Sequence, residues 1–217
     1  MKKRIHIGLA ILVILSASLA CSQFTSGFSQ LIYTGKIVYQ SDLGGNWSLY
    51  SMDVHGGIPA RLTNNSSNNV SPTFISATNQ IGFVSDIKNG WNLYTIDIFG
   101  GNLQTITNNK DTPVDYPNWS PDGKLIAASL AENCTPSVTT CNYDIYVMNT
   151  DDTNRKKITN TTASEWVPVW TPDGQRIAFA SDRDGDGEIY VMNKDGSNVL
   201  QLTNNKGYDG SPRWSPD

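Results

Sequence analysis

Residues 170–182 read WTPDGQRIAFASD and are followed by IYVMN at 189–193 and LT at 202–203. The same elements occur one unit earlier, as WSPDGKLIA at 119–127 and YVMN at 146–149. A tyrosine recurs at one place in each unit, in steps of 44, 52 and 44 residues: Tyr50, Tyr94, Tyr146 and Tyr190. A period of this length is typical of propellers, solenoids and arrays, in which each unit buries its faces against its neighbours.

Each unit is expected to form four short strands. In the last full unit we expect strands at 167–171, 176–181, 188–193 and 199–203, joined by turns such as Thr-Pro-Asp-Gly. An antiparallel meander with alternating apolar residues has two faces to cover, and radial stacking against copies of itself covers both. The sequence therefore predicts an all-β protein, a β-propeller with four repeats of a four-stranded antiparallel blade, at residues 36–63, 71–107, 116–159 and 167–203.

The aromatic residues that recur with the repeat are expected to pack between blades. Besides the recurring tyrosines, these are Trp119, Trp170 and Trp214. A tryptophan can bury a large ring while its indole N–H finds a hydrogen-bond partner. Stacking of sugars on the tryptophans is the alternative function.

The two ends of the repeat region do not match. The first unit starts at its second strand, at 36–41, whereas residues 211–217 form an orphan first strand that stops within a turn. In one interpretation, this last strand completes the first blade, and four blades close by strand exchange between the termini. In the other, the chain is a fragment of a larger ring.

The spaced elements Trp-Ser-Pro-Asp-Gly, Ile-Ala-Phe, Ser-Asp, Ile-Tyr and Leu-Thr resemble the TolB-type, WD-like β-propeller repeat. The likeness covers nearly all of the chain after its first 35 residues, although residues 76–79 replace the turn motif in the second unit and Ser129-Leu130 replaces Ser-Asp in the third. TolB itself carries a sizeable α/β domain before its propeller, and the stretch at 21–35 is too short for one. The resemblance therefore implies a TolB-like propeller that is distinct from TolB.

Residues 1–20 are predicted to be an export signal, and residues 21–35 a short linker. Lys2, Lys3 and Arg4 precede an apolar run that is too short for a convincing membrane-spanning helix, and small residues follow it. Cys21 comes directly after the signal and resembles the acceptor cysteine of bacterial lipoproteins. We therefore expect an exported, periplasmic or cell-surface lipoprotein, and contact with a membrane only through the lipid. Ordinary cleavage of the signal without lipidation is the alternative.

The charge of the chain argues against nucleic acid as a partner. Loss of the three positive charges of the signal changes the formal charge from −4 to −7. A chain this acidic repels phosphate backbones and gains no free energy from counterion release.

An insertion at 131–142 lengthens the third unit. Its two cysteines, Cys134 and Cys141, are close enough in sequence to form a loop-closing disulfide in an oxidising compartment, with two unpaired thiols as the alternative. Insertions in repeat proteins map to loops on one face, often the binding face, so this loop is a candidate for recognition. A neutral loop expansion is the other interpretation.

Motifs for catalysis are missing from the sequence, and we expect neither an enzyme nor a cofactor within these residues. Histidine occurs only at His6 and His55, and no Gly-x-Ser-x-Gly or His-Glu-x-x-His segment occurs. One stretch has the alternating carboxylates that Ca²⁺ prefers: Asp182, Asp184, Asp186 and Glu188. The same stretch also fits a structural hairpin loop, because its repeat-equivalents at 42–45 and 86–89 lack the extra acids.

These features favour a protein-interaction module in the cell envelope, with envelope proteins as partners. The first alternative is the propeller of a truncated prolyl-oligopeptidase-type serine peptidase, because similar propellers precede that hydrolase domain. A carbohydrate-binding surface protein is the second. Fold alone does not separate these functions.

Overall fold

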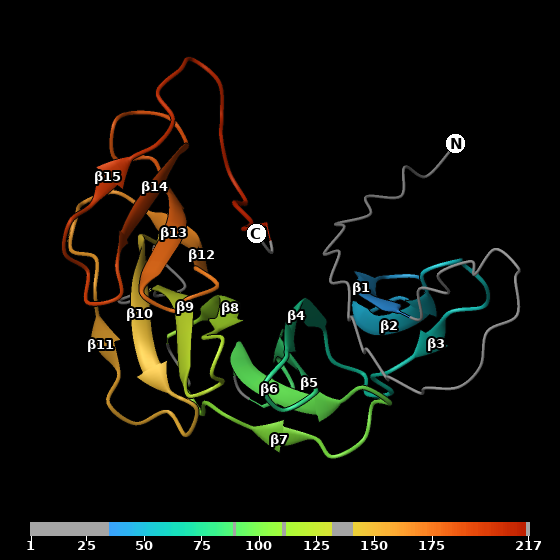
Figure 1. The fold of residues 1–217 in the computed structure, drawn as a ribbon. Coiled ribbons are helices and arrows are strands. Elements are labelled where there is room, and N and C mark those ends of the chain that lie inside the picture. The colour runs from blue at the N-terminus through green and yellow to red at the C-terminus, as the bar shows by residue number, and fades with distance from the viewer. Residues whose placement is uncertain (1–34, 89, 110–111, 132–140, 216–217) are drawn as a thin grey trace, which may run out of the picture.

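The structure is a computed structural model and describes residues 35–88, 90–109, 112–131 and 141–215. These residues form four antiparallel sheets joined by turns and loops, and each sheet is one blade (Figure 1). Blade 1 contains β1 (Lys36–Ser41), β2 (Ser48–Asp53) and β3 (Ala60–Arg61). Blade 2 contains β4 (Asn69–Ile75), β5 (Gln80–Ser85), β6 (Asn92–Asp97) and β7 (Gln104–Thr105). Blade 3 contains β8 (Val114–Trp119), β9 (Leu125–Ala131), β10 (Tyr143–Asn149) and β11 (Lys156–Lys157). Blade 4 contains β12 (Glu165–Trp170), β13 (Arg176–Ser181), β14 (Glu188–Asn193) and β15 (Leu200–Gln201).

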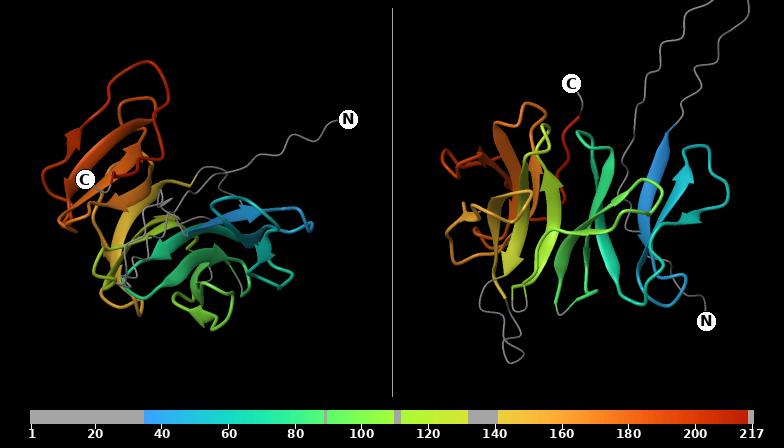
Figure 2. Two further views of the ribbon diagram at one scale, coloured as in Figure 1. Left: turned by 45° about the vertical axis from the view of Figure 1, so that its right-hand side comes forward. Right: turned by 90° about the horizontal axis from the view of Figure 1, so that it is seen from below.

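The blades are arranged around an open arc (Figures 1 and 2). Strands β4, β8 and β12 lie on the inner side of the arc, and β8 contacts both of the others. The short strands β7, β11 and β15 lie on the outside. We call β4, β8 and β12 the inner strands. The predicted all-β propeller is confirmed, and the described part of blade 1 has three strands, as expected for a first unit that starts at its second strand.

Among the described residues the hydrophobic core consists of three clusters, and each fills one interface between neighbouring blades. The first cluster joins Val38 and Leu49 of blade 1 to Phe83 and Tyr94 of blade 2. A second spans blades 2 and 3 around Trp119, and a third spans blades 3 and 4 around Trp170, Phe179 and Tyr190. The four recurring tyrosines are all buried: Tyr50, Tyr94, Tyr146 and Tyr190. Because both faces of a blade must be covered, apolar burial here drives blade stacking as well as strand pairing.

The recurring Leu-Thr or Ile-Thr pair ends each blade by a side-chain contact. The hydroxyl oxygen of Thr107 accepts a hydrogen bond from the Leu93 N–H at 2.9 Å, and that of Thr203 accepts one from the Ile189 N–H at 2.9 Å. This bond replaces a rung of the strand ladder, so the outer strand leaves the sheet before the threonine. The strand that the sequence predicts at 199–203 is therefore shorter, at Leu200–Gln201.

The C-terminal segment does not complete blade 1 in this structure. Within the described residues, β1 pairs with β2 alone, and residues 211–215 are outside any strand, in contrast to the orphan strand predicted there. The indole N–H of Trp214 instead donates to the carbonyl of Val169 at 3.2 Å. In the same way, the indole N–H of Trp170 donates to the carbonyl of Asn118 at 3.1 Å. Trp214 thus lies against blade 4 in the way that Trp170 lies against blade 3.

Candidate functional site

A bulge interrupts each inner strand at the same place. The register shifts between Val70 and Thr73 in β4, between Asp115 and Asn118 in β8, and between Trp166 and Val169 in β12. A proline follows the extra residue in every case, and it cannot donate a backbone N–H to the ladder. The residues before these prolines, and before the proline of the C-terminal segment, have positive φ: Ser71 (52°), Tyr116 (49°), Val167 (53°) and Ser211 (55°). The bulge belongs to the scaffold, but the side chains beside it differ from blade to blade.

Asp115 stands just before the bulge of β8. Its Oδ1 accepts hydrogen bonds from the Ser71 hydroxyl at 2.8 Å and from the Tyr116 N–H at 2.8 Å. The Ser71 N–H donates in turn to Oε1 of Gln40 at 2.7 Å, so a chain of hydrogen bonds connects the first three blades. Burial raises the pKa of the Asp115 carboxyl, although the bonds from Ser71 and Tyr116 act in the opposite direction. None of the salt bridges found in the described parts of the chain includes Asp115.

Tyr208 follows blade 4 and presents an exposed ring that is nevertheless fixed. The residue is 69% exposed. The ring lies nearly parallel to that of Trp166, with centroids 6.3 Å apart and an interplanar angle of 8°, and the indole N–H donates to the tyrosine oxygen at 3.1 Å. A Cβ at Gly187 would lie 2.5 Å from Cδ2 of Tyr208, and one at Gly210 would lie 2.7 Å from its Cε1. Two glycines therefore provide the space in which this ring is held.

Tyr116 and Tyr143 extend the group of rings toward Asp115. Burial raises the pKa of Tyr116, and the charges of Asp115, Tyr208 and Tyr143 raise it further. Burial also raises the pKa of Tyr143, again with a contribution from Asp115. Strand β12 contacts both β8 and β10, and Asp115 and Trp166 occupy equivalent positions on neighbouring inner strands, so these groups share one neighbourhood. We call them the aromatic cluster: Tyr116, Tyr143, Trp166 and Tyr208, with the Asp115 carboxylate beside them.

The cluster lies at the end of the blades where the inner strands begin. Asp115 and Trp166 are the second residues of β8 and β12, and Tyr143 is the first residue of β10. Strands β8 and β10 are both antiparallel to β9 and so start at the same end of blade 3. The insertion predicted at 131–142 connects β9 to β10 at this end.

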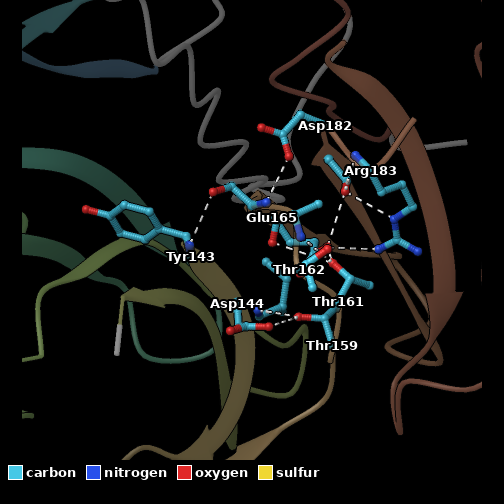
Figure 3. A network of polar contacts seen from close by, with 12 residues as sticks. Tyr143, Asp144, Thr159, Thr161, Thr162, Glu165, Asp182 and Arg183 are labelled. Atoms are coloured by element: carbon cyan, nitrogen blue, oxygen red, sulfur yellow. Dashed lines mark hydrogen bonds and ion pairs between the residues drawn. The ribbon is translucent and has the colours of Figure 1, made fainter. Parts of the chain in front are cut away.

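A buried polar network anchors the start of β12, next to Trp166 (Figure 3). Glu165 is fully buried, and its Oε1 accepts hydrogen bonds from Thr161, Ser181 and Arg183. The guanidinium of Arg183 also lies over the rings of Phe179 and Tyr190, at 5.3 and 4.5 Å from their centroids. Figure 3 shows Tyr143 directed away from this network. The network fixes the backbone that carries Trp166.

The acids predicted as a calcium site are not brought together. Asp182 accepts a hydrogen bond from the Ser164 N–H at 2.8 Å, Asp184 accepts one from Gln201 at 2.5 Å, and the buried Glu188 accepts from Thr203 and Asn205. The Gly185 N–H donates to the Asp182 carbonyl at 3.0 Å, which closes the hairpin turn between β13 and β14. The described residues, including Asp186, contain no group of three or more His, Cys, Asp or Glu that could hold a metal ion. The geometry of this stretch is that of the structural hairpin.

Three other predicted features fall partly or wholly outside the described residues. The signal, the lipidation candidate Cys21 and the insertion cysteine Cys134 all lie there. Cys141 is disulfide-bonded, and its pairing with Cys134 stays a prediction. Across the ranges that the structure describes, no helix is long and apolar enough to cross a membrane.

Sequence reasoning missed the aromatic cluster, because it looked for residues that recur rather than for those that differ. Asp115 and Trp166 occupy the position of Val70 in their inner strands, directly before the bulge. Aligning the blades residue by residue would have marked this position, where one scaffold site carries an apolar, an acidic and an aromatic side chain.

Comparison with known proteins supports the repeat assignment. Residues 116–217 match the family model of the TolB β-propeller domain. The chain is 37% identical over 74 residues to the Tol-Pal system protein TolB of Alcanivorax borkumensis, a match that covers 34% of this chain and 15% of that protein. It is 40% identical over 68 residues to dipeptidyl-peptidase 5 of Porphyromonas gingivalis, covering 30% of this chain and 10% of that protein.

The fold is also similar to that of TolB. The crystal structure of TolB from Acinetobacter baumannii superposes with a TM-score of 0.63 and 26% identity, over 76% of this chain and 39% of that one. The chain thus spans well under two thirds of the length of these relatives. Residues 116–217 thus match the TolB β-propeller domain, and the chain is similar in repeat and fold to TolB-type propellers.

Proposed function

We propose that this chain is a protein-interaction module of the cell envelope and that it binds its partner through the aromatic cluster. The observation that carries the proposal is the ring of Tyr208, which is exposed to solvent yet fixed by Gly187, Gly210 and Trp166. Tyrosine and tryptophan are enriched at the centres of protein interfaces. A ring that is already immobilised loses little conformational entropy on binding, so it favours recognition.

Site-specific photo-crosslinking tests this proposal. A photoreactive phenylalanine analogue placed at Tyr208 or Tyr116, in cells, should capture a defined envelope protein. The matched control is the same analogue at Phe99, which is 77% exposed on the turn between β6 and β7. Capture of the same set of proteins from Phe99 as from Tyr208 would contradict a binding role for the cluster.

The envelope location is a proposal that rests on the sequence and on the relatives. The export signal and Cys21 support a lipid-anchored protein, and one matching relative is a Tol-Pal system protein. The test is detergent phase partition of the wild type and of Cys21→Ala. We expect the wild type in the detergent phase and the variant in the aqueous phase. Equal partition of the two would mean ordinary cleavage without a lipid.

A second candidate function is the propeller part of a serine peptidase. The observation in its favour is the 40% identity to a dipeptidyl-peptidase over 68 residues. Reading the coding sequence beyond Asp217 separates the two candidates. A Gly-x-Ser-x-Gly segment would favour the peptidase, and further Trp-Ser-Pro-Asp-Gly repeats would favour the interaction module.

A further inference from the structure

The aromatic cluster contains a negative charge that the described protein does not neutralise. Asp115 accepts two hydrogen bonds, both at Oδ1, and no salt bridge in the described ranges includes it. The chain as a whole is acidic, with a formal charge of −4. A partially buried carboxylate of this kind attracts a positive charge and repels a negative one, and its low-dielectric surroundings strengthen both effects.

The aromatic rings around Asp115 also favour a positively charged ligand. The faces of tyrosine and tryptophan rings carry negative electrostatic potential and attract cations within about 6 Å of the ring centroid. The phenols of Tyr116 and Tyr143 are neutral at physiological pH, as tyrosine side chains normally are, so their rings are available for such contacts. Blade 4 already contains an example, because the Arg183 guanidinium lies 4.5 Å from the ring centroid of Tyr190 and also pairs with Glu165.

We propose that the aromatic cluster binds a cationic side chain, Lys or Arg, of a partner polypeptide, with the charge paired to Asp115 and the stem packed against the rings. This inference rests on the proposed function and specifies the chemistry of the partner. An apolar side chain in the same place would remove water from the Asp115 carboxylate without giving it a counter-charge, which is unfavourable. An acidic side chain would be repelled by it.

The inference is tested with short capped peptides that differ at one central residue: Lys, Arg, norleucine or Glu. Binding to the full chain is measured by calorimetry. We expect the Lys and Arg peptides to bind at least about tenfold more tightly than the norleucine peptide, and the Glu peptide not to bind. Equal affinities for the Lys and norleucine peptides would overturn the inference.

Variants of the protein test whether Asp115 is responsible for the preference for a cationic peptide. Asp115→Asn keeps an acceptor for the Ser71 hydroxyl but removes the charge, and it should reduce the preference for Lys over norleucine to near unity. The matched control is Asp122→Asn, since the Asp122 side chain is 59% exposed in the turn after β8. An unchanged preference in Asp115→Asn would also overturn the inference. If Asp115→Asn does not fold, Tyr208→Ala serves in its place and should lower the affinity for the Lys peptide.

The outcome is separable from that of the proposed function. Suppose that a probe at Tyr208 captures an envelope protein in Asp115→Asn as efficiently as in the wild type. This result would support the docking surface but contradict a cationic ligand at Asp115. With the probe at Tyr116, Tyr208→Ala should lower capture of the envelope protein, and undiminished capture would contradict the docking role of Tyr208. Failure of both the peptides and the crosslinking would reject the two proposals together.

Discussion

The indole ring of Trp119, on the inner strand of blade 3, lies against Gly82 in blade 2 so closely that a Cβ at Gly82 would overlap the ring atoms Cζ3 and Cη2. Trp119 is 7% exposed and belongs to the cluster that joins the two blades. Blades 2 and 3 can therefore pack in this way only because residue 82 has no side chain. A glycine in the middle of a strand weakens the strand, and here the weakness is offset by burial of an indole.

Gly82→Ala should destabilise the protein by about 1–3 kcal/mol, because the added methyl group must displace a packed ring. Denaturant unfolding measures the change, and the matched control is Gly44→Ala. A Cβ at Gly44 would have its nearest contact at 3.5 Å, with the Arg61 guanidinium. Equal effects of the two substitutions would contradict the close approach of Trp119 to Gly82.

The ion pair between Arg183 and Glu165 gives a second prediction. Glu165 is fully buried, and the Arg183 Nη2 lies 3.2 Å from its Oε1. Arg183→Ala leaves a buried carboxylate without its cation and removes two cation–π contacts, so we expect a loss of about 3–5 kcal/mol in the free energy of unfolding. The control is Lys124→Ala, which removes an exposed pair at 4.0 Å and should cost less than about 1 kcal/mol. A small effect of Arg183→Ala would show that solvent reaches Glu165.

The threonine that ends each blade gives a third prediction. Thr107 is fully buried; its hydroxyl accepts from the Leu93 N–H at 2.9 Å and donates to the Asn92 side chain at 3.0 Å. Thr107→Val keeps the shape but leaves the Leu93 N–H without an acceptor, which should cost about 1–3 kcal/mol. Thr105→Val, on the exposed strand β7, should stay within about 0.5 kcal/mol of the wild type. Thermal unfolding of the two variants side by side would reveal a structural role that the sequence repeat alone does not explain.

Much of this scaffold could be predicted from the sequence, because its repeat carries local signals. The strands predicted at 176–181 and 188–193 coincide with β13 and β14, since alternating apolar residues and the Pro-Asp-Gly turn specify them without reference to the rest of the chain. The bounds of the short outer strand β15 could not be predicted as accurately. Its end depends on a side-chain bond between Thr203 and Ile189, which lie far apart in sequence.

The candidate site could not be predicted from the sequence, for a different physical reason. Its residues come from inner strands, a loop and the start of β10, and only the radial packing of blades brings them together. The stack of Trp166 on Tyr208 is a tertiary result with no local signature. The carboxylates at Asp182 and Asp184, by contrast, form a clear local pattern, yet the structure directs them to separate partners.

The pH dependence of Asp115 gives the last prediction. Because burial raises the pKa of this carboxyl in the folded state, its ionised form opposes folding at pH values above that pKa. As the pH falls through the raised pKa toward the unfolded value of about 4, the folded state takes up the proton first, and the contribution of Asp115 to stability increases.

Asp115→Asn should therefore be at least as stable as the wild type at pH 7.5, and the difference should diminish as the pH falls toward 4. Urea unfolding of both proteins at several pH values measures this difference, with Asp122→Asn as the control. Hydrogen bonds lower the pKa of the exposed Asp122, so its substitution should show the opposite trend with pH. If Asp115→Asn were clearly less stable at pH 7.5, the carboxylate would already have a favourable partner within the protein, and the case for a cationic ligand would fail with it.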